Sequence, residues 1–188
     1  MKGLIGTLRG ILPDTAFFFE ADYSTPMSSA LVVGEQDIAV LYSPVLQPDL
    51  TFETLGEVTY VMVSRTAECL DDIPRNGYIF GNYSAAFAHA HEALFPDLSE
   101  ASLSIGQNAA MVDLLTSLEG SGYMFEHSAK ALVETGGCRY VADAPKITQP
   151  VFVGLNMRNR HRPAYRKMIR ALHDHFGPVT TARRRSRR

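Results

Sequence analysis

The sequence predicts an α/β fold made of two lobes, each with a mixed, mostly parallel sheet flanked by helices. Two observations lead to this prediction. Segments whose apolar residues recur at helical spacing alternate with short segments rich in β-branched and aromatic residues, which is the pattern of βαβ units. These segments also form two series, separated by the polar connector at 66–77. A chain of 188 residues is long enough for one domain or for two small lobes.

The first series begins with apolar residues at helical spacing from Leu4 to Leu12, and Pro13 ends that pattern. Ser24 or Thr25 is a candidate cap for the next helix, which Gly34 closes. The elements that we expect are a helix at 4–12, a strand at 15–21, a helix at 24–34, a strand at 37–43 and two extended segments at 51–57 and 58–65.

The second series repeats the alternation after residue 77. Gly120, Ser121 and Gly122 are interpreted as a tight turn between a helix and a strand. The remaining elements that we expect are strands at 78–80, 101–105, 123–125, 139–145 and 150–156, and helices at 85–95, 109–119, 126–137 and 161–176.

The charges are distributed unevenly, although the formal net charge is only −2. Residues 1–153 contain 7 basic and 19 acidic residues, whereas 154–188 contain 11 basic residues and one acidic residue. This split indicates an acidic globular body with a basic C-terminal end. The tail at 179–188 is expected to be disordered, and its arginines either contact a phosphate backbone or simply extend into solvent.

The composition excludes membrane-spanning and disulfide-framework proteins. No apolar run reaches the roughly 18 residues that a membrane helix needs. Arg9 interrupts the apolar stretch near the N-terminus, which has no cleavage site of the signal-peptide type. We therefore expect a cytoplasmic protein with no membrane partner, in which Cys69 and Cys138 are free thiols.

Three predicted strand-to-helix turns carry small polar residues. Each offers backbone N–H groups and the positive end of a helix dipole, which together can hold a carboxylate or another small anion. Alternatively, Ser24, Ser84 and Asn108 serve only as helix caps. Because all three turns occupy the same topological position, we expect an anion-binding site. The turns are Tyr23–Ser24–Thr25, Gly81–Asn82–Tyr83–Ser84 and Gly106–Gln107–Asn108.

No constellation of catalytic residues is found in the sequence. It contains neither a G-x-S-x-G elbow, nor a phosphate-binding P-loop, nor a dinucleotide-binding G-x-G-x-x-G. His89 and His91 are two residues apart, as are His173 and His175, and this spacing points helix side chains about 200° apart. We interpret these histidines as structural and expect no enzyme activity, no cofactor and no metal site.

Several short motifs follow one another along these elements. They are GILPD (10–14), TAFFFEA (15–21), GEQDIAVLY (34–42), 111–133, CRYVADAP (138–145) and 150–176. In this order they resemble the effector-binding, or regulatory, domain of LysR-type transcriptional regulators. In that family a helix ends in Leu-Pro, a strand follows, and the next helix closes on Gly-x-x-Asp and a hydrophobic residue. A later helix runs into Gly-x-Gly, and a strand beginning with Pro precedes an Asn/Arg-rich turn and a last helix.

The resemblance implies a two-lobe fold like that of periplasmic binding proteins, crossed twice by the chain. Residues 1–76 and 150–178 would form lobe I, residues 77–149 would form lobe II, and an effector would bind in the cleft between them. Carried over by position, the effector-binding residues are Ser24, Thr25, Tyr42 and Ser43 in lobe I, and Gly81, Asn82, Tyr83, Gln107, Asn108, Gly122 and Met124 in lobe II.

The resemblance also implies a homodimer or tetramer that binds DNA only through a winged helix-turn-helix domain, which this chain lacks. By this resemblance, the chain is expected to start inside the first helix of the regulatory domain. Its missing first strand is expected to leave backbone groups of 15–21 and 37–42 unpaired. We expect the ligand-sensing domain of a DNA-binding regulator, with a small anionic effector. A stand-alone small-molecule-binding protein and, less favoured, an enzyme on the same fold are the alternatives.

Overall fold

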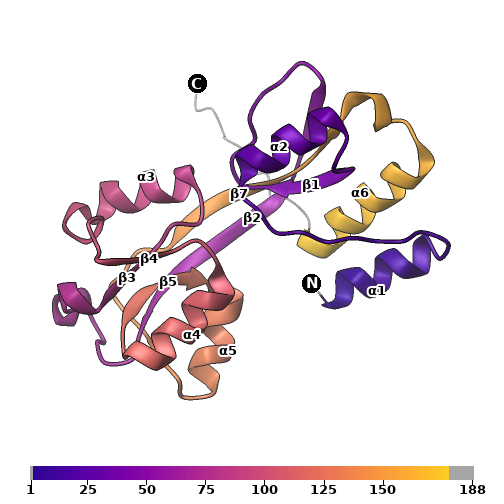
Figure 1. The fold of residues 1–188 in the computed structure, drawn as a ribbon. Coiled ribbons are helices and arrows are strands. Elements are labelled where there is room, and N and C mark those ends of the chain that lie inside the picture. Colours follow the sequence, from indigo (N-terminus) through magenta and orange to yellow (C-terminus); the bar gives the residue numbers. More distant parts are fainter. Residues whose placement is uncertain (1, 178–188) are drawn as a thin grey trace, which may run out of the picture. The chain divides into compact units, whose positions relative to one another are not determined.

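The structure, a computed structural model, describes residues 2–177 in two compact units (Figure 1). The predicted disordered tail at 179–188 lies outside the described residues. The first unit contains the described residues up to Glu57 and from Pro150 onward, and the second contains Val58–Gln149. Two long strands contribute residues to both units: β2 (Leu50–Ser64) and β7 (Ile147–Asn156).

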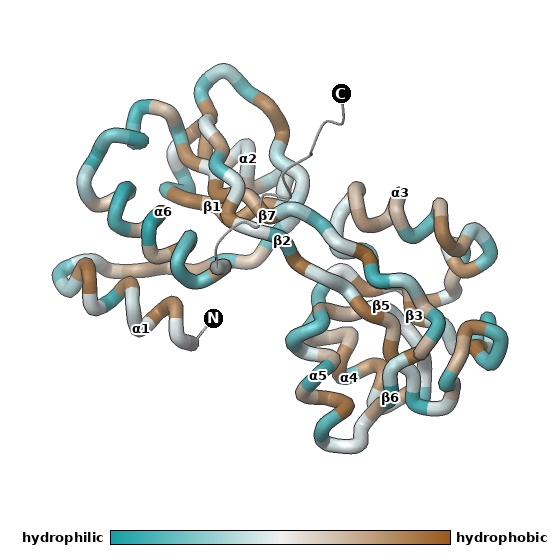
Figure 2. The backbone as a smooth tube through the Cα atoms, turned by 180° about the vertical axis from the view of Figure 1, so that it is seen from behind, coloured by the Kyte–Doolittle hydropathy of each residue, from teal (hydrophilic) through white to brown (hydrophobic). Residues whose placement is uncertain are grey.

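The first unit places β1 beside β7 in an antiparallel pair, with Ile38 opposite Leu155 and Leu41 opposite Phe152. The neighbour of β7 on its other side is β2. Leu31 is fully buried against β1, and the tube of Figure 2 is brown, hence apolar, along that strand. The other elements of this unit are α1 (Lys2–Ile11), α2 (Ser24–Val33), β1 (Ile38–Leu41), the 3-10 helix η4 (Met157–Asn159) and α6 (Pro163–Phe176).

The second unit contains a mixed sheet with the strand order β2–β5–β3–β4, and β6 lies beside β2. The β5 strand is antiparallel to β2 and parallel to β3, and β3 is parallel to β4. The helices and strands are β3 (Tyr78–Gly81), α3 (Ala85–Leu94), β4 (Leu103–Ile105), α4 (Asn108–Leu118), β5 (Ser121–Phe125), α5 (Glu126–Glu134) and β6 (Arg139–Tyr140), with 3-10 helices η1 (Leu70–Asp72), η2 (Arg75–Gly77) and η3 (Pro96–Leu98).

The core of the second unit is unusually aromatic. Tyr60, Phe87 and Tyr123 are completely buried, and the Tyr60 ring stacks on Tyr83 with 5.0 Å between centroids. Met111 and Leu115 of α4 belong to the same core. This core holds β3, β4 and β5 in place. The ends of these strands position the residues at the starts of α3, α4 and α5.

The predicted strand at 15–21 does not form. This segment is irregular, and the Phe18 side chain is 87% exposed. Among the described residues no strand lies beside it, so its backbone has no ladder to join despite its β-forming composition. The helix–strand–helix–strand order over 4–43 therefore does not build the expected parallel sheet, and the partner of β1 is the antiparallel β7.

Three further boundaries differ from the expectation. The extended segments 51–57 and 58–65 form one continuous strand, β2, and 139–145 supplies only the two-residue strand β6. Ser121 and Gly122 belong to β5 rather than to a turn, because they pair with Ser64 and Val63 of β2. The second unit begins at Val58 and therefore contains 58–76.

Candidate functional site

The carboxyl ends of β3, β4 and β5 lie at one edge of the sheet in the second unit. The three strands are mutually parallel, and each is followed within a few residues by the first turn of a helix. The backbone N–H of Asn82, just after β3, donates to the carbonyl of Ile105 at the end of β4 over 2.9 Å. The starts of α3, α4 and α5 therefore share one edge, where their first N–H groups have no partner within the helix.

Ser84 caps α3, as the cap interpretation predicted. Its Oγ accepts from the N–H of Phe87 over 3.0 Å. The same hydroxyl also bonds the amide of Gln149, with 2.9 Å to Oε1 and 2.7 Å to Nε2, and both residues are buried. The Tyr60 hydroxyl donates to Gln149 Oε1 over 3.4 Å. Gln149 thus fixes the start of α3, and no local motif in the sequence marks this residue.

Asn108 connects the starts of α4 and α5. It is the first residue of α4, whose N-cap position is taken by Gln107. Its Oδ1 accepts from the N–H of Phe125 over 2.8 Å, and its Nδ2 donates to Ser128 Oγ over 2.8 Å. The half-buried Asn108 therefore links the N-terminus of α4 to that of α5 by two hydrogen bonds, rather than only capping its own helix.

Asn82 and Gln107 have exposed side chains at this edge, and no hydrogen bond of either side chain is present among residues 2–177. These two amides are free to meet a ligand. Gly81, by contrast, is buried and faces the ring of Tyr83, so a Cβ at Gly81 would collide with that ring.

Tyr83, Gly122 and Met124 are packed inside the second unit. The Tyr83 hydroxyl donates to the carbonyl of Tyr123 over 2.6 Å, and burial raises its pKa. Met124 is 0% exposed, and a Cβ at Gly122 would lie 2.7 Å from the carbonyl oxygen of Ile79. These three residues shape the wall behind the strand ends.

In the first unit, the expected side-chain cap of α2 is absent. The N-cap position is Tyr23, which makes no side-chain capping bond, and Thr25 is exposed within the first turn. Ser24 Oγ instead accepts from the N–H groups of Tyr42 and Ser43, over 3.3 and 3.2 Å. The Ser24 hydroxyl therefore serves as the acceptor for two backbone N–H groups just after β1 and not for the N–H groups of its own helix.

Tyr42 and Ser43 are half-buried beside the start of α2. Burial raises the pKa of Tyr42, so its phenol is neutral at physiological pH. The Oγ of Ser43 is buried and has no hydrogen-bond partner among the described residues. An unpaired buried hydroxyl costs free energy, and a ligand group at the start of α2 could satisfy it.

His91 is structural, as its spacing from His89 predicted. It is completely buried, its Nε2 lies 2.6 Å from the Tyr78 hydroxyl, and burial lowers its pKa to about 4. His89 is exposed on the other side of α3. Over the described range, no group of three or more His, Cys, Asp or Glu side chains could hold a metal ion.

None of the helices within residues 2–177 is both long enough and apolar enough to cross a membrane.

Comparison with known proteins places the whole described range in one family. Residues 2–177 match the model of the LysR substrate binding domain. A search of curated proteins returned no match.

Among solved structures, the chain is similar to the regulatory domain of MexT, a transcriptional activator in Pseudomonas aeruginosa. The TM-score is 0.74 and the sequence identity 17%, and the match covers 92% of this chain and 90% of the MexT chain. It is also similar to the C206S mutant of the OxyR2 regulatory domain from Vibrio vulnificus, with a TM-score of 0.72 and 14% identity over 92% and 87% of the two chains. The Synechocystis PCC6803 CcmR regulatory domain in complex with 2-PG gives a TM-score of 0.71 and 14% identity over 93% and 90%. The fold is thus that of LysR regulatory domains, and the chain belongs to the LysR substrate binding domain family.

Proposed function

We propose that this chain is the ligand-sensing domain of a LysR-type regulator and that it binds a small anionic effector without transforming it. The observation that carries the proposal is the shared edge of the second unit, where three helix N-termini stand beside the free amides of Asn82 and Gln107. Helix N-termini favour negative charge, and exposed amides can donate hydrogen bonds to it.

The first unit contributes a second set of polar groups. Ser43 Oγ is buried without a described partner, and Thr25 is exposed in the first turn of α2. We propose that these hydroxyls bind an anionic group at the start of α2. The relative CcmR binds 2-PG, which makes this compound a suitable first probe here.

Effector binding would act by population shift, because a ligand changes a conformational equilibrium only through different affinities for the two states. We propose that the responding protein is a homodimer or tetramer. DNA would be bound by a winged helix-turn-helix domain outside this chain. A cytoplasmic location fits this role.

A thermal-shift screen tests the proposal. The probes are small carboxylates and 2-PG, each at matched ionic strength against sodium chloride. We expect at least one probe to raise the melting temperature in a saturable way. Stabilisation at 100 times the dissociation constant amounts to about 3 kcal/mol.

Site variants then locate the binding. Asn82→Ala and Gln107→Ala remove exposed side chains without a bond in the described structure, so the fold should be unaffected while the affinity falls about five- to tenfold. Asn76→Ala is the matched control, because Asn76 is exposed in η2 directly before β3, whereas Asn82 follows that strand. Equal weakening by Asn76→Ala would overturn the assignment of the edge.

A stand-alone binding protein would use the same residues. Full-length protein containing the upstream coding region separates the two functions: a regulator shows effector-dependent binding to its promoter DNA, and a stand-alone binder does not.

A further inference from the structure

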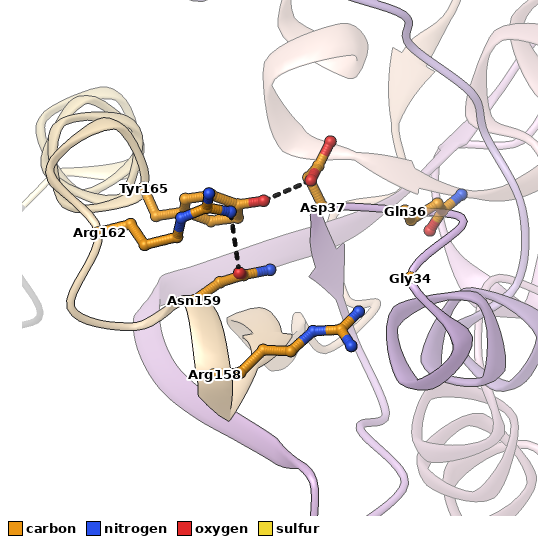
Figure 3. A pocket seen from close by; sticks show the side chains of 7 residues that line it. All are labelled: Gly34, Gln36, Asp37, Arg158, Asn159, Arg162 and Tyr165. Carbon is orange, nitrogen blue, oxygen red and sulfur yellow. Dashed lines mark hydrogen bonds between the residues drawn. The ribbon is translucent and has the colours of Figure 1, made fainter.

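A cavity of about 430 Å³ lies in the first unit, at the end of α2 opposite to Ser24 (Figure 3). It belongs to the loop that joins α2 to β1 and to the segment that leads from β7 into α6. Its lining residues are Gly34, Gln36, Asp37, Arg158, Asn159, Arg162 and Tyr165.

Arg158 brings an unpaired positive charge to this cavity. No hydrogen bond or ion pair of its guanidinium is present among the described residues, and Figure 3 shows the side chain standing free beside Gly34. Gly34 has a φ of 84°, and a Cβ there would lie 2.6 Å from Arg158 Nη2. The glycine therefore permits both the left-handed end of α2 and the close approach of the guanidinium.

Arg162 supplies the second positive charge. Its guanidinium carbon lies 5.9 Å from the centroid of the Tyr165 ring, and its Nη1 donates to Asn159 Oδ1 over 3.3 Å. Arg162 is also the residue before Pro163, where α6 begins, so the positive end of that helix dipole is nearby. A guanidinium that is already held against an aromatic ring loses less side-chain conformational entropy on binding an oxyanion than one that moves freely in solvent.

The cavity also contains two acceptors, which limit the anions that it can take. Asp37 Oδ1 accepts from the Tyr165 hydroxyl, and Gln36 Oε1 is buried with no partner within the described residues. The Asp37 carboxylate repels an anion unless that anion donates a proton to it. Two guanidinium groups and one carboxylate leave a net positive cavity.

We infer that this cavity binds inorganic phosphate in its protonated forms, with Arg158 and Arg162 on the oxygens and a P–OH group donating to Asp37 or Gln36. Bidentate guanidinium–oxyanion pairs are strong and geometrically selective. Near pH 7 inorganic phosphate always keeps a P–OH donor, whereas sulfate has none and a phosphomonoester is largely deprotonated. The site would make the first unit responsive to phosphate independently of the proposed effector edge.

The experiment is a titration of the ¹⁵N-labelled chain at pH 7, followed through the Nε–H signals of its arginines. The probes are inorganic phosphate, sulfate and glycerol phosphate at constant ionic strength. We expect saturable shifts of Arg158 and Arg162 with phosphate, and a dissociation constant at least fivefold lower than for the other two. Arg158→Gln and Arg162→Gln should each weaken phosphate binding about tenfold.

Two further variants decide whether the site is selective. Asp37→Asn should bring sulfate to within twofold of phosphate, because it removes the repulsion. Arg166→Gln is the matched control on the exposed face of α6 and should leave phosphate binding unchanged. The inference is overturned if phosphate and sulfate bind wild type equally, if neither shifts the two arginines, or if Arg166→Gln weakens binding as much as Arg158→Gln.

Discussion

The Tyr78 hydroxyl and His91 Nε2 lie 2.6 Å apart in the buried core of the second unit. The His91 ring stacks near Phe87 and meets Tyr123 edge-on, and its Nδ1 has no partner among the described residues. A charged imidazole would be poorly accommodated in such surroundings. Burial accordingly lowers the pKa of His91 to about 4.

The stability of the domain should therefore fall as the pH is lowered from about 6.5 to 4. In this pH window His91 is protonated in the unfolded chain, where its pKa is near 6.5, but stays neutral in the folded protein. Protonation therefore favours the unfolded state. The lost free energy of unfolding is about 3 kcal/mol and is complete below pH 4. Urea unfolding at several pH values measures it.

The double variant Tyr78→Phe/His91→Phe should lose this component of the pH dependence. Replacing both partners avoids leaving a buried hydroxyl unpaired. His89→Phe, on the exposed side of the same helix, should retain it. An unchanged pH profile in the double variant would show that His91 is not the responsible group.

Ser84→Ala should destabilise the second unit by about 2 kcal/mol. The change removes the cap of α3 and the partner of the buried Gln149 amide together. Ser117→Ala, at an exposed position of α4, should change stability by less than about 0.5 kcal/mol. Chemical denaturation compares the two, and equal effects would contradict the structural role of Ser84.

Gly122→Ala should destabilise the domain by about 2 kcal/mol, because the new methyl group would lie 2.7 Å from the Ile79 carbonyl and force β5 away from β3. Gly6→Ala, in the exposed part of α1 with nothing within 4 Å, should instead stabilise it by about 1 kcal/mol. Opposite signs in urea unfolding are the expected result. A neutral Gly122→Ala would mean that the two strands are not packed so closely.

Ser24→Ala should loosen the chain just after β1, because Tyr42 and Ser43 both donate their N–H groups to Ser24 Oγ. Amide hydrogen exchange at these two residues should accelerate about fivefold, with about 1 kcal/mol lost locally. Ser29→Ala removes only an exposed bond to the Thr25 carbonyl and should leave both rates unchanged. Unaltered exchange in Ser24→Ala would contradict the assigned hydrogen bonds.

Much of the fold follows from local sequence patterns. The helix at 2–11 ends before Pro13 as predicted, Gly34 closes α2, and Ser84 caps α3. Periodicity and capping residues are local properties, so a single sequence reveals them. The composition of 15–21 is equally local, but a strand needs a neighbour, and no local pattern shows whether one is present.

The candidate site was less predictable for the same reason. The structure buries Tyr83 and Met124 in the core of the second unit, and no local pattern in the sequence shows this burial. The position of Asn108 at a turn predicts a polar role. Its hydrogen-bond partners Phe125 and Ser128, however, lie 17 and 20 residues away in the sequence, too far for a local pattern to reveal. The role of Gln149, 65 residues from Ser84, has no sequence signal at all.

The most direct test of the central claim is an amide chemical-shift map of the chain titrated with the tightest-binding anion from the screen. The account predicts saturable shifts at Asn82, Gln107 and Asn108 of the second unit, and weaker shifts in Asn82→Ala. Shifts confined to other residues, or no saturable shift with any effector-sized anion, would contradict the assignment of this domain as an anion sensor.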